Sequence, residues 1–181
     1  LFVPICGFIV YSQDFYTLWQ SSLSAEEIQI ITILSTITMI QVYFNATTAS
    51  MAQLSVVVNK LKLPVFVSFG CGVLNVAIVL LLLNFTALGV YAIVLSSSLI
   101  MCLRYILFNS FYAAWCLKKP KTTFLWTTVK TWLSIPVLIG FMWVIKYFLP
   151  VSSWGGLILD AVICAAIGYL GMVVVYNREL V

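Results

Sequence analysis

Long apolar stretches separated by short polar connections make up most of this chain. A membrane-spanning helix needs about 20 predominantly apolar residues, and six stretches reach or approach that length. They cover residues 1–13, 28–58, 64–83, 89–116, 124–148 and 155–176. The first is shorter than the roughly 18 residues of a complete span. We therefore expect its helix to begin upstream and the sequence to be the C-terminal part of a longer protein.

The stretches are apolar on all sides, as residues 73–83 illustrate. The strands of a membrane β-barrel instead have about 10 residues with alternating polar and apolar positions, and nothing in this sequence alternates in that way. The pattern therefore predicts an all-α fold, a polytopic transmembrane bundle of about six spans that forms one domain over residues 1–181. Pro136, inside the fifth stretch, predicts a kink.

Composition supports the membrane interpretation. The 181 residues are 64% hydrophobic and 8% charged, with a mean hydropathy of +1.15. An ordinary soluble domain has about 25% charged residues, so most of this protein's exterior must face hydrocarbon. The net charge of +4 does not indicate nucleic-acid binding, because Lys and Arg in a multi-pass protein report topology first. We expect membrane lipids as partners and no nucleic acid.

The basic residues are distributed unevenly over the two sides that six crossings create. Arg104 lies within a span and Lys146 alone falls on one side. The other side receives Lys60, Lys62, Lys118, Lys119, Lys121, Lys130 and Arg178. By the positive-inside rule this second side is cytoplasmic, which predicts that both ends of the fragment are in the cytoplasm. The acidic pair Glu26 and Glu27 falls on the opposite face and is typical of the first turn of a helix.

Signatures of enzymes are absent from the sequence. It has no histidine, no glycine-rich phosphate loop and no close pair of intramembrane carboxylates. The five cysteines lie singly in or beside apolar stretches, without a CxxC pair, which is typical of small core residues and not of a metal site. We expect no enzymatic activity, no catalytic residue, no metal and no cofactor.

A polar stripe follows the second stretch. Thr38, Gln41, Asn45 and Thr48 recur at spacings of three and four residues, so they share about one quarter of a helical surface. Unpaired amides that face lipid cost a few kcal/mol each, and we therefore expect all four side chains to face the bundle interior. Two interpretations remain open: interhelical hydrogen bonding, or the lining of a hydrophilic passage.

Arg104 is a cation within the fourth stretch. At the centre of a bilayer it would cost about 2.5 to 3.5 kcal/mol on insertion scales. Its guanidinium can snorkel to the head groups, or it can face a cavity and meet an anion such as a lipid-linked diphosphate, which suits a planar fork of donors. Both interpretations remain open.

Two further polar residues lie within predicted spans. Asp160 stands at helical spacing with Cys164, Gly168 and Gly171, a face of small residues that favours close helix packing near the outer interface. A role in ion coupling is the alternative for Asp160. For Asn75 we expect a hydrogen bond to another helix in preference to a substrate.

Several short motifs together resemble one family. Asn59-Lys60-Leu61-Lys62-Leu63-Pro64 is similar to an Asn-Lys-x-Lys junction between two spans, followed after about a dozen residues by an Asn, here Asn75. Leu88-Gly89-Val90-Tyr91 resembles a Leu-Gly-Val helix entry, and residues 108–114 resemble a Phe-x-Pro-x-Tyr-Ala-Ala stretch. Leu18-Trp19 is similar to a Leu-Trp that ends an earlier span. By these motifs, over roughly residues 1 to 130, the chain resembles the bacterial polysaccharide repeat-unit flippases, a branch of the multidrug, oligosaccharidyl-lipid and polysaccharide exporter superfamily.

Two positions depart from the pattern of this family. Ser110 stands where Pro is frequent, so the bend expected there is in question, and Ala92 stands where Gly is common. The last two stretches agree with the family only in number and hydropathy.

The resemblance implies a function and a whole-protein architecture. It implies a two-bundle transporter of about 12 to 14 helices that works by alternating access, with this chain as the last six. Its implied role is to move undecaprenyl-diphosphate-linked oligosaccharide across the bacterial plasma (inner) membrane, driven by an ion gradient, with the polysaccharide polymerase machinery as a candidate partner. A drug or cation exporter of the same superfamily, and a membrane anchor or assembly module without transport, are the alternatives. Mid-span acids are expected in a cation exporter, whereas the mid-span charge here is Arg104.

Overall fold

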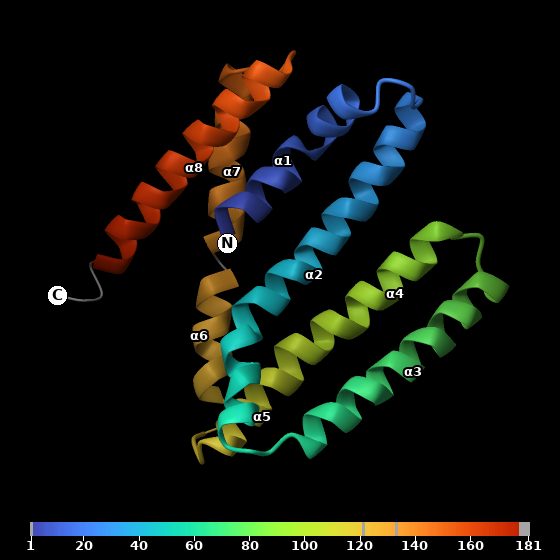
Figure 1. Cartoon of the computed structure of the whole chain (residues 1–181), viewed down its shortest axis with the longest axis vertical. Helices are drawn as coiled ribbons and strands as arrows, with labels where there is room; N and C mark the ends of the chain where they lie inside the picture. Colours follow the sequence, from blue (N-terminus) through green and yellow to red (C-terminus); the bar gives the residue numbers. More distant parts are fainter. Residues whose placement is uncertain (1, 121, 133, 178–181) are drawn as a thin grey trace. The chain divides into compact units, whose positions relative to one another are not determined.

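The computed structural model describes residues 2–120, 122–132 and 134–177. Within these ranges every regular element is a helix, which confirms the predicted all-α fold (Figure 1). The chain divides into two compact units. The terminal unit combines the chain up to Met39 with the chain beyond Trp132, and the central unit is Ile40–Trp132. The long helix α2 (Ala25–Val57) contributes its first part to the terminal unit and its second part to the central unit.

Helix length and apolar character identify a multi-pass membrane protein. Four of the described segments are long and apolar enough to cross a membrane: α2, α3 (Lys62–Phe85), the helical segment Val90–Cys116, and Trp154–Gly171 of α8 (Trp154–Asn177). They correspond to four of the six predicted stretches. Spanning by the first and fifth stretches stays a prediction.

Within the fifth stretch, expected as one segment over 124–148, the structure describes two helical ranges on either side of residue 133. They are α6 (Thr122–Trp132) and α7 (Ser134–Phe148), and they belong to different units. Within α7, Ile135–Phe148 is apolar but shorter than the four spanning segments. The first stretch is longer than expected, because α1 (Phe2–Trp19) includes residues assigned to a polar connection. Aromatic contacts continue to its end, with the Phe15 and Trp19 ring centroids 5.5 Å apart.

The terminal unit has its core where α1, α7 and α8 pack together. The buried cluster consists of Cys6, Val10, Tyr11, Met142 and Cys164. All five cysteines are free. Cys6 and Cys164 lie in this core, as predicted, whereas Cys71, Cys102 and Cys116 are half-buried. At Gly168 an added Cβ would lie 2.8 Å from Val3 Cγ2. Close packing on the small-residue face of α8 is thus confirmed at Gly168.

A capping box begins α2. The Ser24 backbone N–H donates to Glu27 Oε2 at 2.8 Å, and the Glu27 N–H donates to Ser24 Oγ at 3.3 Å. This reciprocal pairing satisfies two of the N–H groups that every helix start leaves without partners. The predicted helix start with acids in its first turn is confirmed.

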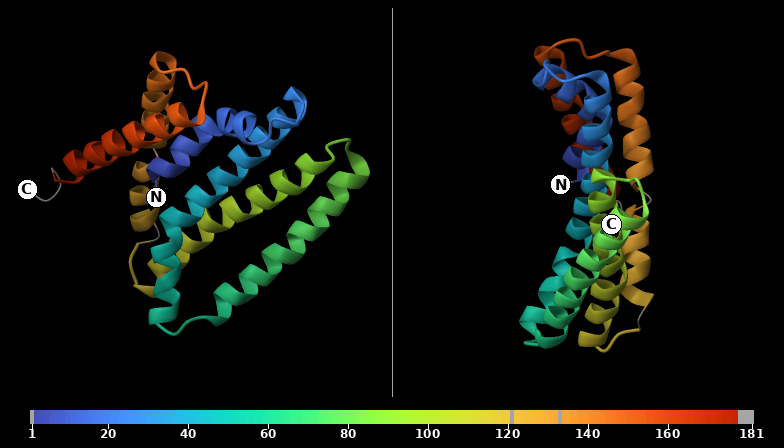
Figure 2. Two further views of the ribbon diagram at one scale, coloured as in Figure 1. Left: turned by 45° about the horizontal axis from the view of Figure 1, so that its top comes forward. Right: turned by 90° about the vertical axis from the view of Figure 1, so that its right-hand side faces the viewer.

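The central unit is built on a helical hairpin. Its first arm is α3, and its second arm is the segment Val90–Cys116, called the α4–α5 rod below, which comprises α4 (Val90–Leu103), the π-helix η1 (Arg104–Asn109) and α5 (Ser110–Cys116). Figures 1 and 2 show α4 between α3 and the second part of α2. Gly89 enters α4 with a φ of 53°, a left-handed conformation that glycine adopts without steric cost.

The surface of α3 is suited to lipid contact. None of its residues is buried, and Phe66 and Phe69 are more than 70% exposed, at 73% and 72%. Large apolar side chains in such numbers on one face are typical of a membrane or interaction surface. The polar contacts of the central unit lie between its helices and at the end where α2 and α5 finish.

Candidate functional site

Charge is divided sharply between the two units. Residues 40–132 contain seven basic residues and no acidic residue. All five acidic residues belong to the terminal part of the sequence: Asp14, Glu26, Glu27, Asp160 and Glu179. The central unit thus supplies no carboxylate to its own cations.

Two members of the polar stripe join α2 to the α4–α5 rod. Ser98 Oγ donates to Gln41 Oε1 at 3.1 Å, and Asn109 Nδ2 donates to Thr48 Oγ1 at 3.2 Å. Thr48, Ser98 and Asn109 are buried. Gln41 and Thr48 are separated by about 10 Å along the helix axis. For Gln41 and Thr48, two of the four residues of the stripe, the interpretation as interhelical hydrogen bonding is therefore confirmed.

The other two members of the stripe lie outside this interface. Thr38 and Asn45 are exposed, and the Thr38 hydroxyl donates to the Leu34 carbonyl of its own helix at 2.9 Å. At 100° per residue these two positions are rotated by about 60° from Gln41 and Thr48. For Thr38 and Asn45 the lining of a hydrophilic passage stays a prediction.

Asn75 fastens the two arms of the hairpin. Its Nδ2 donates to Ser97 Oγ at 3.1 Å, and its Oδ1 accepts from Ser96 Oγ at 2.9 Å. The amide thus uses both of its polar atoms between α3 and α4. The prediction of a hydrogen bond to another helix is confirmed.

Arg104 begins the π-helix η1, near the middle of the α4–α5 rod. π-Helical turns inside α-helices are frequent at functional sites. The guanidinium is half-buried and has weak contacts: Nη1 lies 3.9 Å from Met101 Sδ, and Cζ lies 5.8 Å from the centroid of the Tyr105 ring. Its Nε is buried, and no hydrogen-bond partner for it occurs among the described residues. Arg104 is thus a mid-span cation that its own unit leaves undersatisfied.

The terminal unit pairs one of its charges and buries another. Lys146 Nζ lies 2.5 Å from Asp14 Oδ2 and donates to the Val10 carbonyl at 3.0 Å. Asp160 is only 2% exposed, and its Oδ2 finds no partner in the part of the chain that the structure describes. This burial agrees with the close helix packing expected on this face of α8, and the position of Asp160 near the outer interface stays a prediction. Its role in ion coupling stays a prediction.

Sequence reasoning treated the lysines at one end of the central unit only as markers of topology. In the structure Lys60 Nζ lies over the Trp115 ring, 4.2 Å from its centroid. Sequence reasoning also gave Asn109 and Ser98 no role of their own. The available signal was that both are polar residues inside an otherwise apolar span, the criterion that identified Asn75.

The fold and the charge distribution define the class of this protein as an all-α, multi-pass membrane protein. In residues 2–120, 122–132 and 134–177 no cluster of His, Cys, Asp or Glu is arranged to hold a metal ion. Comparison of the chain with protein-family models, with curated proteins and with solved structures finds no match.

Proposed function

We propose that this chain belongs to a flippase that translocates undecaprenyl-diphosphate-linked oligosaccharide repeat units across the bacterial plasma membrane for surface polysaccharide assembly. The observation that carries the proposal is the state of Arg104, a half-buried cation in the middle of a membrane-spanning rod whose unit contains no carboxylate. Such a cation is costly in hydrocarbon unless an anion meets it. A diphosphate on a lipid carrier supplies that anion within the membrane.

Position and chemistry favour substrate contact over snorkelling. Arg104 lies about 18 Å along the helix axis from the end of the rod at Cys116, a long way for one side chain to reach the head groups. A guanidinium binds phosphate oxygens through two parallel N–H donors, and its Nε is one of the atoms that no described residue engages. The exposed amide of Asn45 and hydroxyl of Thr38 add groups that can hydrogen-bond to sugar.

The orientation follows the positive-inside rule. Lys60, Lys118 and Lys119 gather at one end of the central unit, so we assign that end to the cytoplasm and both ends of the chain with it. Lys146, the basic residue on the other side, is neutralised by Asp14. That pair lies between α1 and α7, in agreement with an assignment of both positions to the outer side.

The alternatives fit the charges less well. A cation or drug exporter would need acids along its passage, and residues 40–132 contain none. A passive anchor has no use for a mid-span arginine, which costs about 2.5 to 3.5 kcal/mol on insertion scales.

The test uses three substitutions of Arg104 in the full-length protein, expressed in a bacterial strain that lacks its own flippase. Arg104→Lys should retain partial polysaccharide assembly, because charge survives, whereas Arg104→Gln and Arg104→Ala should lose it. Expression and membrane insertion are matched before the comparison. In a binding assay with undecaprenyl diphosphate, Arg104→Gln should lose roughly tenfold to a hundredfold in affinity, as expected for charge-assisted hydrogen bonds of about 1.5 to 3 kcal/mol. Normal assembly with Gln would eliminate the proposed role.

A further inference from the structure

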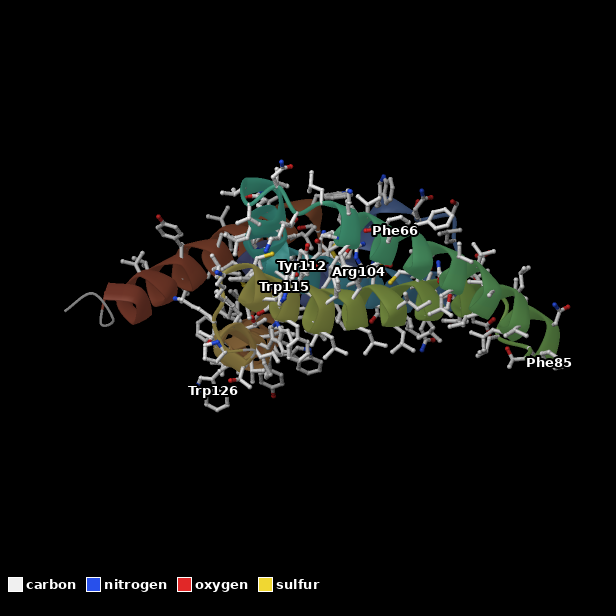
Figure 3. The ribbon with its side chains drawn as sticks, turned by 90° about the horizontal axis from the view of Figure 1, so that it is seen from below. Phe66, Phe85, Arg104, Tyr112, Trp115 and Trp126 are labelled. Carbon is white, nitrogen blue, oxygen red and sulfur yellow. The ribbon has the colours of Figure 1, made fainter. Side chains whose placement is uncertain are left out.

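A group of lysines lies at the end of the central unit where α2 and α5 finish. Lys60, Trp115, Lys118 and Lys119 line a pocket of about 290 Å³. Figure 3 shows Tyr112 and Trp115 near one another on the α4–α5 rod, with Phe85 at the opposite end of the hairpin. Arg104 does not line this pocket and precedes Trp115 by about 16 Å along the helix axis.

Contacts between the two helix ends hold this pocket together. The Tyr112 hydroxyl donates to the Lys60 carbonyl at 2.7 Å. The rings of Tyr112 and Trp115 stack with centroids 5.4 Å apart, and Lys60 Nζ lies 4.2 Å from the Trp115 centroid. A cation over an indole ring gains roughly 0.5 to 1 kcal/mol at an exposed site. This contact favours a position of the Lys60 side chain against Trp115 of α5.

The backbone at this end places Asn59 and Lys118 where glycine is the usual residue. Both helices end in Schellman motifs: the Lys60 N–H donates to the Ser55 carbonyl at 2.9 Å, and the Lys119 N–H donates to the Ala114 carbonyl at 3.0 Å. The residue before each donor is left-handed, Asn59 with a φ of 52° and Lys118 with a φ of 53°. Asn tolerates this conformation, but for Lys it costs roughly 1 to 2 kcal/mol.

Electrostatics leaves the pocket positive. The C-terminal ends of α2 and α5 each contribute about −0.5 of an elementary charge, against three lysine charges. The unit adds no carboxylate, so about two positive charges remain after the helix ends are counted. An anionic ligand is the natural complement.

We propose that this pocket binds the phosphate head group of an anionic membrane lipid from the leaflet it faces. Trp115 is 58% exposed, and apolar side chains beside the lysines are exposed as well, with Val57 at 80% and Leu61 at 42%. Tryptophan is enriched at the membrane interface, and basic clusters beside membrane spans attract anionic lipids. The apolar border distinguishes a lipid from free phosphate, because only a lipid brings acyl chains to cover it. This inference does not depend on the transport activity proposed above.

The test is native mass spectrometry of the full chain in detergent, with equal amounts of phosphatidylglycerol and phosphatidylcholine added. The wild-type chain should retain phosphatidylglycerol preferentially. Lys60→Gln and Lys119→Gln should each reduce its affinity about fivefold, the factor that corresponds to about 1 kcal/mol per lysine near an anionic lipid. Lys62→Gln is the matched control, because Lys62 is an exposed lysine at the start of α3 that does not line the pocket, and it should reduce the affinity less than the pocket variants do.

Lys118→Gly separates binding from folding. Glycine suits the left-handed backbone, so the variant should unfold no earlier than the wild type while it retains less phosphatidylglycerol. Equal loss in Lys62→Gln and the pocket variants would indicate diffuse attraction and would overturn the site. Displacement of the lipid by excess inorganic phosphate would overturn the lipid assignment, as would the lack of any preference for phosphatidylglycerol.

Discussion

Asn109 donates its amide hydrogen to the Thr48 hydroxyl at 3.2 Å, and both of these side chains, 61 residues apart in sequence, are buried. Asn109 is the last residue of the π-helix, five residues after Arg104. The bond therefore fixes the turn that carries Arg104 against α2. Gln41 and Ser98 repeat the connection on the other side of Arg104 along the rod.

Removal of the Asn109–Thr48 bond should loosen the α4–α5 rod from α2. We expect Asn109→Ala to lower the free energy of unfolding by about 1 to 3 kcal/mol, because it leaves the Thr48 hydroxyl without an interhelical partner and opens a cavity. In a double-mutant cycle with Thr48→Val the coupling energy should be about 0.6 kcal/mol, the average for interhelical hydrogen bonds in membrane proteins. Unfolding in detergent provides the measurement. Thr38→Val, an exposed position on the same helix, is the control and should be close to neutral.

Close approach of α8 to α1 predicts opposite effects at two glycines of one helix. An Ala Cβ at Gly168 would meet Val3 Cγ2 at 2.8 Å, whereas at Gly171 nothing lies within 4 Å. Overpacking costs about 1 to 3 kcal/mol, and Val has little rotamer freedom to move aside. The gain in helix propensity from Gly to Ala is about 1 kcal/mol. Gly168→Ala should therefore destabilise the protein and Gly171→Ala should stabilise it slightly. Thermal unfolding in detergent checks the signs, and equal effects at both positions would contradict the packing argument.

The sequence predicted the helices of this protein better than their contacts. Hydropathy placed the third and fourth stretches within two residues of α3 and the α4–α5 rod, because apolar length is a property of local sequence. The division of the polar stripe could not be predicted, since it depends on how much of α2 the rod covers. The π-helical turn at Arg104 contains neither Pro nor Gly, so its residue types do not predict a departure from the α-helix.

For the candidate sites too, features of the local sequence were predicted and contacts between distant segments were not. The unusual position of Arg104 was evident from a charge inside an apolar stretch, and Asn75 was assigned correctly on the same criterion. The lipid pocket was missed because Lys60 and Trp115 are 55 positions apart in sequence, and nothing local indicates that the ends of α2 and α5 meet.

The topology can be tested with single cysteines in a chain from which the five native cysteines have been removed. The Tyr112–Lys60 hydrogen bond brings the connection after α2 against α5, so Leu61→Cys and Lys119→Cys should react alike. We expect both to be labelled only from the cytoplasm and Thr86→Cys, in the turn after α3, only from outside. Impermeant maleimide applied to cells and to inverted vesicles distinguishes the two sides. Opposite labelling of positions 61 and 119 would contradict the fold, whereas reversal of all three would contradict only the orientation.

Two aspartates of the terminal unit should respond in opposite ways to the same substitution. Asp14 forms an ion pair with Lys146, so Asp14→Asn removes the charge that stabilises a half-buried ammonium and should lower the unfolding temperature. Asp160 is buried, and its Oδ2 has no partner among the described residues. Burial of a charged carboxylate is costly, and Asp160→Asn keeps its shape while it removes the possibility of charge. That variant should therefore unfold no earlier than the wild type.

If Asp160 couples an ion to transport, polysaccharide assembly should nevertheless fall in Asp160→Asn at equal expression, because an amide cannot exchange a proton. A stable Asp160→Asn variant with normal assembly would leave Asp160 as a packing residue, and a strongly destabilised one would show that its carboxyl group has a stabilising partner.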